Sequence, residues 1–142
     1  MAVGDTMFVE SIGREQGETI MSFLHESDAP MRAAQIRVLG GAIARVAPSE
    51  TAFAHRDSPI MLNLASFYLG PEDLPVRQDW LHRFAAAMRQ IDDGAYIGFL
   101  GDEDSSQVRR AYPPETWARL TELKRRYDPE NLLHRNQNVP PG

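Results

Sequence analysis

Alternating apolar and polar residues predict several β-strands in the first half of the chain. The strongest pattern covers residues 60–69, where even and odd positions are both apolar. The apolar residues are Ile60, Leu62 and Leu64 at even positions, and Met61, Ala65 and Phe67 at odd positions. Successive side chains of a strand point to opposite faces, so this strand is expected to be central and covered on both sides.

Weaker patterns predict further strands. Residues 35–46 predict a bent strand or a pair of strands, since Gly40 and Gly41 interrupt the alternation as glycines do at bulges. Two more strands are expected at 51–56 and 95–100, and Phe8–Val9 can add a short one.

Helical spacing of apolar residues predicts three helices, at 19–25, 79–91 and 113–127. In the last of these, a stripe expected to be buried consists of Trp117, Leu120, Leu123 and Tyr127. Asp128 is expected to cap one further turn with Pro129 at its first position, and an extended tail rich in Asn, Gln and Pro follows.

Strands outnumber possible crossover helices in this order of elements. The expected fold class is therefore α+β, with a mostly antiparallel sheet, helices packed on one face, and a final helix and extended tail. The chain contains neither a Gly-x-Gly-x-x-Gly turn nor a phosphate-binding loop, so it carries no dinucleotide site of the Rossmann kind.

Composition narrows the possible functions. The 142 residues carry a formal net charge of −5 without a long basic run, which argues against a nucleic-acid partner. There are no cysteines, and the histidines lack the spacing of helical metal sites, so neither a disulfide nor a metal centre is expected. No apolar stretch has the length of a membrane span, and the first residues lack the pattern of a secretory signal, so we expect a cytoplasmic protein.

Three motifs in a fixed order resemble one family. They are Leu-Gly-Gly-Ala-Ile-Ala-Arg-Val at 39–46 followed by Thr-Ala-Phe-Ala-His-Arg at 51–56, Gly-Ala-Tyr-Ile-Gly-Phe at 94–99, and the helix, Asp-Pro stop and polar tail of 119–141. Together they resemble the carboxy-terminal part of FAD-linked oxidoreductases of the berberine-bridge-enzyme type. The resemblance covers residues 36–141, most of the chain.

The resemblance implies a division of the chain and a cofactor. Residues 1–104 would be a partial substrate-binding domain and residues 105–142 the berberine-like terminal segment. The parent enzyme would use FAD to accept a hydride from an alcohol or amine carbon of a small-molecule substrate. Its FAD-binding domain has no counterpart in these residues, so we expect this chain to be inactive alone, and to pair with a flavin-domain polypeptide or form a homo-oligomer.

The resemblance also implies site residues. Tyr96 retains a hydroxyl beside the flavin ring and is the candidate acid/base. Phe99 replaces the family's second aromatic, often the tyrosine base, and cannot accept a proton. Since a strand is expected here, Tyr96 and Phe99 would point to opposite faces.

Two further groups of residues complete the expected site. His55 and Arg56 would lie on the substrate side. Gly98, which stands where the family has an asparagine, and Asn136 and Asn138 of the tail would contact the cofactor.

Other interpretations remain open. Tyr96 and Phe99 can be ordinary sheet residues, His55 a hydrogen-bonded sheet histidine with Arg56 at the surface, and the tail a flexible terminus. A second function class is a stand-alone interaction module that pairs with a separate flavin subunit. DNA just upstream of Met1 that encodes a flavin domain would favour the enzyme.

Overall fold

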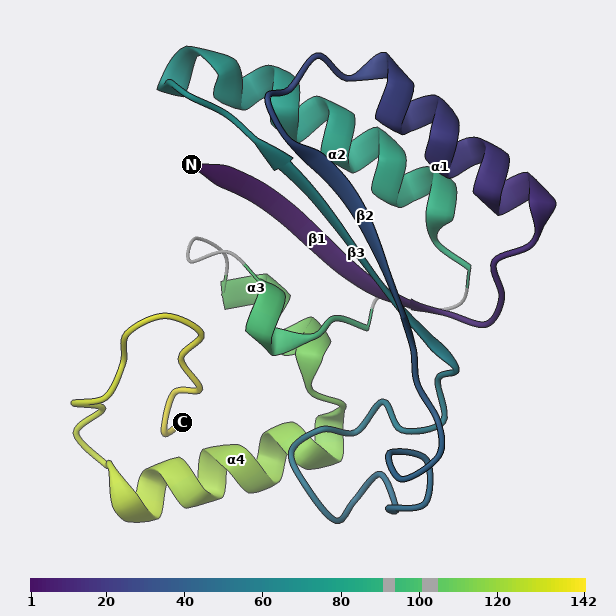
Figure 1. Cartoon of the computed structure of the whole chain (residues 1–142). Helices are drawn as coiled ribbons and strands as arrows, with labels where there is room; N and C mark the ends of the chain where they lie inside the picture. The colour runs from purple at the N-terminus through teal and green to yellow at the C-terminus, as the bar shows by residue number, and fades with distance from the viewer. Residues whose placement is uncertain (91–93, 101–104) are drawn as a thin grey trace.

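The computed structural model describes residues 1–90, 94–100 and 105–142, and its strands form one antiparallel sheet (Figure 1). The strands are β1 (Ala2–Val9), β2 (Arg32–Val38) and β3 (Ile60–Phe67), in the order β1-β3-β2. The register pairs Phe8 with Met61 and Arg37 with Met61. The α+β fold class is confirmed, and so is the central place of the strand expected at 60–69.

Two helices, α1 (Arg14–Glu26) and α2 (Leu74–Met88), cover one face of this sheet (Figure 1). The core lies between the sheet and these helices and consists mainly of Met7, Val9, Ile20, Leu62, Leu64, Trp80, Leu81, Phe84 and Met88. The two helices contact each other through Phe23 and Phe84, whose ring centres are 4.6 Å apart, and through the Trp80 Nε1–H, which donates to the Phe23 carbonyl. Burial of these large side chains is the main source of stability.

The remaining elements lie outside the sheet and its two covering helices, one just before α2 and the others after it. They are two single 3₁₀ turns, η1 (Pro71–Asp73) and η2 (Ile97–Phe99), and two helices, α3 (Ser105–Ala111) and α4 (Pro114–Tyr127). The predicted final helix is confirmed as α4, with proline in its first turn, where a missing N–H has no intrahelical partner to lose. Sequence analysis missed α3.

Several predicted boundaries were wrong. β1 begins at Ala2 rather than near Phe8, α1 begins at Arg14, and α2 begins at Leu74, where Pro75 occupies its first turn. The predicted end of this helix at residue 91 was also wrong, because α2 ends at Met88. Residues 101–104, for which the sequence predicts an acidic loop, lie outside the described residues.

The strands expected at 35–46 and 51–56 were also wrong. β2 ends at Val38, because Gly40 and Gly41 adopt φ values of +135° and +53° and turn the chain out of the sheet. The segment 39–59 then returns to β3 as a long loop with turns of its own, such as Glu50 N–H to Ala47 O at 3.0 Å. The apolar alternation of 51–56 thus has no neighbouring strand with which to pair.

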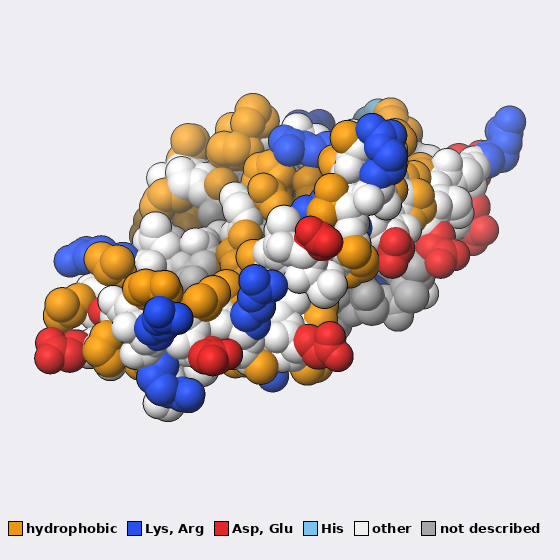
Figure 2. Space-filling view, turned by 90° about the horizontal axis from the view of Figure 1, so that it is seen from below, with side chains coloured by type: hydrophobic (Ala, Val, Ile, Leu, Met, Phe, Trp, Pro, Cys, Tyr) orange, Lys and Arg blue, Asp and Glu red, His pale blue; other side chains and the backbone are white. Residues whose placement is uncertain are grey.

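The stripe predicted to be buried along α4 is largely exposed. Leu123 is 42% and Tyr127 is 73% exposed, and no residue of α4 is buried. Figure 1 shows why: α4 lies away from the sheet, alongside the loop 39–59. Figure 2, which views the molecule from that side, shows hydrophobic side chains interspersed with arginine and lysine over this surface.

Candidate functional site

The sheet face opposite α1 and α2 carries the candidate site. Met7, Val9, Leu62 and Leu64 pack toward the helices, so their neighbours in the strands point the other way. By the register of the strands, Phe8, Met61 and Arg37 form one row on this face, and Thr6, Asn63 and Gln35 form the next. The row of Phe8 and Met61 therefore ends in the cation Arg37, and the next row consists of uncharged polar side chains.

The segment 94–100 lies over β1 on this face. The Tyr96 N–H donates to the Thr6 Oγ1 at 2.8 Å, and the Phe99 N–H donates to the Tyr96 carbonyl at 3.0 Å, which closes the η2 turn. The strand predicted at 95–100 was therefore wrong.

The predicted opposite orientation of Tyr96 and Phe99 was wrong for the same reason. Residues three apart in a 3₁₀ turn lie on the same side of it. The two ring centres are 5.5 Å apart with an interplanar angle of 63°, an edge-to-face contact. The turn thus brings together the two aromatic residues that a strand would have separated.

Gly98 makes this pair possible. A Cβ placed on Gly98 would lie 2.8 Å from Cε1 of Tyr96, closer than real Cβ contacts. The backbone of Gly98 is therefore in close contact with the tyrosine ring. Its predicted contact with the cofactor stays a prediction.

The loop 39–59 completes an aromatic cluster. The His55 ring stacks on Phe8 at 4.2 Å, and the Phe53 ring lies 6.2 Å from Phe8 and 6.0 Å from Tyr96. We call Phe8, Phe53, His55, Tyr96 and Phe99 the aromatic wall. The structure thus brings the predicted residues Tyr96, Phe99 and His55 into one cluster, although their sequence positions are far apart.

Two arginines border the aromatic wall. The Arg56 guanidinium lies 5.5 Å from the Phe53 ring centre and donates to the Ile43 carbonyl and to Thr51 Oγ1, so it holds the loop 39–59 closed. The Arg37 guanidinium lies 4.8 Å from the Phe99 ring centre. Sequence reasoning missed Arg37, although its position between Ile36 and Val38 indicated the opposite face.

A buried carboxylate ties the site to β1. Asp5 Oδ1 accepts from the Thr6 N–H at 2.8 Å and from Arg110 at 3.3 Å, and Asp5 Oδ2 accepts from Arg89 at 3.4 Å. The backbone carbonyl of Arg110, in α3, in turn accepts from the Ala95 N–H. Ala95 is therefore linked through Arg110 to Asp5 in β1, the strand that also binds the Tyr96 N–H.

The carboxy-terminal tail is fastened to α4 at its start. Asp128 accepts from the N–H groups of Leu132 and Leu133 at 2.7 and 2.9 Å, and from Lys124 Nζ. The predicted cap of a further helical turn was wrong, because residues 129–130 form only a turn and no helix follows. The hydrogen bond from Lys124 is the largest of several contacts that lower the pKa of Asp128 below its ordinary value. Farther on, Arg125 donates to the Pro141 carbonyl.

The tail then reaches the site segment at its far end. The Gln137 Nε2 donates to the Leu100 carbonyl at 2.8 Å. Asn136 is exposed with φ of 59°, and the buried Asn138 Oδ1 has no hydrogen-bond partner among the described residues. Within that set no hydrogen bond links Asn136 or Asn138 to the aromatic wall, so their cofactor roles stay predictions.

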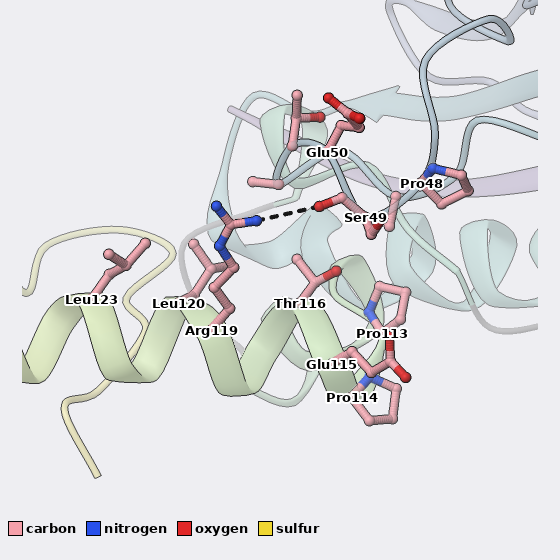
Figure 3. Close-up of a pocket in the computed structure, with 13 residues that line it drawn as sticks. Pro48, Ser49, Glu50, Pro113, Pro114, Glu115, Thr116, Arg119, Leu120 and Leu123 are labelled. Carbon is pink, nitrogen blue, oxygen red and sulfur yellow. Dashed lines mark hydrogen bonds between the residues drawn. The ribbon is translucent and has the colours of Figure 1, made fainter.

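A separate cavity of about 760 Å³ lies between the loop 39–59 and α4 (Figure 3). Ala52 and Ala54 line it, while the residues that follow each of them, Phe53 and His55, belong to the aromatic wall. Arg119 crosses the gap and donates to the Ser49 carbonyl at 3.3 Å. None of the predicted site residues lines this cavity.

Within residues 1–90, 94–100 and 105–142, no group of three or more His, Cys, Asp or Glu side chains is arranged to hold a metal ion. In the same ranges, no helix has both the length and the apolar character needed to cross a membrane.

Comparisons with known proteins point to FAD-linked oxidoreductases. Residues 95–140 match the model of the family described as Berberine and berberine like. The uncharacterized FAD-linked oxidoreductase YgaK of Bacillus subtilis is 30% identical over 123 residues, 87% of this chain and 27% of YgaK. The (R)-6-hydroxynicotine oxidase of Paenarthrobacter nicotinovorans is 33% identical over 100 residues, 66% of this chain and 21% of that enzyme. This chain thus spans about a quarter of the length of these relatives.

Solved structures share the fold. The wild-type BBE-like 1 protein of Physcomitrella patens superposes with a TM-score of 0.80 at 19% identity, over 98% of this chain and 30% of that one. At this identity the likeness concerns the fold alone. FAD is the cofactor that the names of the sequence relatives imply for the family.

Proposed function

We propose that this chain forms the substrate-facing wall of a berberine-like FAD-linked oxidoreductase, and that it corresponds to the carboxy-terminal part of such an enzyme. The enzyme would oxidise a small molecule at an alcohol or amine carbon. The relationship rests on the match over residues 95–140 and on relatives that are named FAD-linked oxidoreductases. A cytoplasmic location and a flavin-binding polypeptide, in the same chain or a separate one, are part of this proposal.

One observation carries the proposal: the Tyr96 phenol is held in a fixed place over the sheet face opposite α1 and α2. Its backbone N–H is bound by Thr6 and its ring contacts Phe99 and Phe53. The segment lies at the start of the family match. A positioned phenol beside a substrate hydroxyl is the arrangement that general acid–base catalysis needs.

The residues present fit one side of a flavin ring system. The buried amide oxygen of Asn138 lacks a partner among the described residues and suits the N–H of an isoalloxazine. Gln137 joins the tail to Leu100, so Asn138 and the exposed backbone of Gly98 belong to linked segments. We propose that these two residues hold the cofactor edge. FAD, when bound, supplies the acceptor for the substrate hydride.

The chain's own residues would then orient the substrate and move a proton. In its phenolate form, the Tyr96 oxygen would accept the proton of the substrate hydroxyl as the C–H bond of the adjoining carbon is oxidised. The rings of Phe99, Phe53 and His55 would pack against the substrate and exclude water, which strengthens each polar contact within the site. Arg56, which already binds the loop 39–59, would keep His55 and Phe53 in place.

A stand-alone interaction module is the second candidate, favoured by the open edge of β2 and its exposed Val38. The two candidates differ in their relation to flavin. We expect the 142-residue chain to bind no FAD tightly by itself. We expect the assembly of this chain with its flavin-binding polypeptide to retain a flavin absorbance band through gel filtration.

The decisive measurement is flavin reduction in that assembly. An alcohol or amine substrate should bleach the flavin band without oxygen, and bleaching should require this chain. A flavin polypeptide that is reduced equally well without this chain would contradict the proposal and leave the interaction module as the better function.

A further inference from the structure

The β2 side of the aromatic wall is cationic. Arg37 lies beside Met61 in the register, with its guanidinium over the Phe99 ring. Its Nε–H donates to the neutral amide of Gln35 at 3.1 Å, and its side chain belongs to an exposed residue. Among the described residues, no Asp or Glu forms an ion pair with Arg37. Arg37 is therefore an exposed cation that borders the aromatic wall.

Some arginines near the sheet have carboxylate partners, whereas Arg32 of β2 donates to the Leu24 and Ala29 carbonyls. Arg89 and Arg110 pair with Asp5, and Arg77 pairs with Asp28. The chain as a whole is acidic, with 20 Asp and Glu against 15 Lys and Arg. Arg37 is thus an exposed cation without a described carboxylate contact, in a chain that is acidic overall. It favours an anionic ligand at this place.

We propose that Arg37 binds a carboxylate of the small molecule that lies on the aromatic wall. This inference rests on the proposed function and specifies its substrate class. A guanidinium is planar and can bind a carboxylate through two parallel N–H groups. The contact of Arg37 with the Phe99 ring limits the rotamers that binding must immobilise.

The contacts of Phe99 set the shape of the ligand. The Phe99 ring touches Tyr96 at 5.5 Å on one side of the site and Arg37 at 4.8 Å. The proton acceptor and the anion binder are therefore both neighbours of one phenyl ring. A matching substrate is a flat molecule about one aromatic ring long, with an alcohol or amine carbon at one end and a carboxylate at the other.

The test uses 4-(hydroxymethyl)benzoate and its neutral amide, 4-(hydroxymethyl)benzamide, as probes. Each is titrated into the full chain while the Arg37 Nε–H and Tyr96 N–H resonances are followed by NMR. We expect the carboxylate to bind about fivefold more tightly, the factor for about 1 kcal/mol of a solvent-exposed ion pair. The preference should fall as salt is raised, because ions screen an exposed pair.

Variants separate Arg37 from general charge. Arg37→Gln should abolish the preference, and Arg37→Lys should keep part of it, since lysine retains charge without the planar fork. Arg45→Gln, an exposed arginine of the loop 39–59, is the matched control and should keep the full preference. Unchanged β3 amide shifts would show that each variant is folded. Equal binding of the two probes, or an unchanged preference in Arg37→Gln, would overturn the proposal.

This test is independent of flavin. The titration contains no FAD, so a carboxylate preference that depends on Arg37 stands even if flavin reduction by the assembly fails. In the opposite case, flavin reduction that shows no advantage for carboxylate substrates would overturn the role of Arg37 and leave the proposed function intact.

Discussion

Tyr96 is constrained by both its backbone and its ring. Its N–H is bound by a threonine that is fully buried, and its ring meets Phe99, Phe53 and the bare backbone of Gly98. Each contact removes a direction in which the phenol could move. A group held in this way keeps its hydroxyl close to one place, which is what distinguishes an acid/base residue from a tyrosine that only packs.

The first prediction concerns the hydroxyl itself. Tyr96→Phe removes one oxygen and leaves the edge-to-face contacts with Phe99 and Phe53 in place, so folding should be unaffected. In the assembly with its flavin polypeptide, loss of a positioned acid/base group should slow flavin reduction about 10²–10⁴-fold. Anaerobic stopped-flow absorbance measures the rate. An unchanged rate would make Tyr96 a packing residue.

The second prediction concerns the space beneath the ring. Gly98→Ala introduces a methyl group 2.8 Å from Tyr96 Cε1, so the ring must move. The Tyr96 ring resonances should shift and flavin reduction should slow. Because Gly98 has an ordinary φ, this effect would come from the close contact and not from backbone strain. Gly17→Ala is the control, because nothing lies within 4 Å of its added Cβ. In helix α1 it should instead stabilise the fold by about 0.5–1 kcal/mol. Unperturbed Tyr96 signals in Gly98→Ala would contradict the prediction.

At the scale of elements, one hydrogen bond fastens η2 to β1. Thr6→Val keeps the shape of the side chain but leaves the Tyr96 N–H without its acceptor. A backbone donor left unsatisfied should reduce the free energy of unfolding by about 1–3 kcal/mol. Urea denaturation measures this change. Thr19→Val is the control: its hydroxyl bonds an exposed carbonyl in α1, where water can replace it. Equal effects of the two changes would refute a special role for Thr6.

A single carboxylate fastens the tail to α4. Hydrogen bonds from Lys124 and from two backbone N–H groups lower the pKa of Asp128, so the folded state binds its proton less tightly than the unfolded chain does. This contribution to stability is therefore complete above the ordinary Asp pKa of about 3.9 and is lost as pH falls through the lower folded value.

The fourth prediction is that acid or mutation releases the tail. The amide shifts of Leu132 and Leu133 should move in one step below about pH 4. Asp128→Ala should show the released shifts already at neutral pH, with the sheet resonances unchanged. Asp73→Ala provides a comparison, because that carboxylate makes no side-chain cap to α2. Leu132 and Leu133 shifts that are the same in wild type and Asp128→Ala would contradict the tail-fastening role.

These elements also show what the sequence could predict. The central strand and α4 were recognisable because local patterns determine them: two apolar faces for 60–67, and Pro114 and Asp128 at the helix ends. The strand predicted at 51–56 was wrong because a strand needs a neighbouring strand with which to pair. The left-handed backbone of Gly41 turns the chain out of the sheet before this segment. The strand predicted at 95–100 was wrong because a hydrogen bond to Thr6, some 90 residues away, holds this segment across the face of the sheet.

The same distinction applies to the site. Motifs identified Tyr96, Phe99 and His55, and the fold brings these residues together, but their contacts depend on elements distant in sequence. Phe8 and Arg37 went unnoticed because none of the motifs contains them, although both lie in predicted strands. The alternation at 35–38 already put Arg37 on the face opposite Ile36 and Val38, but nothing in the sequence indicated that Phe99 would lie over it.

For the whole molecule, the two faces of the sheet are unequal. One is sealed by α1 and α2, while the other is covered only in part, by η2 and the loop 39–59 (Figure 1). β2 has β3 as its only strand neighbour among the described residues, and Ile36 and Val38 along it are 47% and 81% exposed. An open edge with apolar side chains is a place where another strand can add.

The last prediction follows from that edge. The 142-residue chain should form dimers or larger aggregates at high concentration, because β2 presents unpaired backbone groups beside exposed Val38. Val38→Lys places a charge at the edge and should shift the chain toward monomer in sedimentation velocity. Val76→Lys is the control, since Val76 is 60% exposed on α2, away from the edge, and should leave association unchanged. A wild-type chain that stays monomeric at high concentration would show that this edge needs no partner strand.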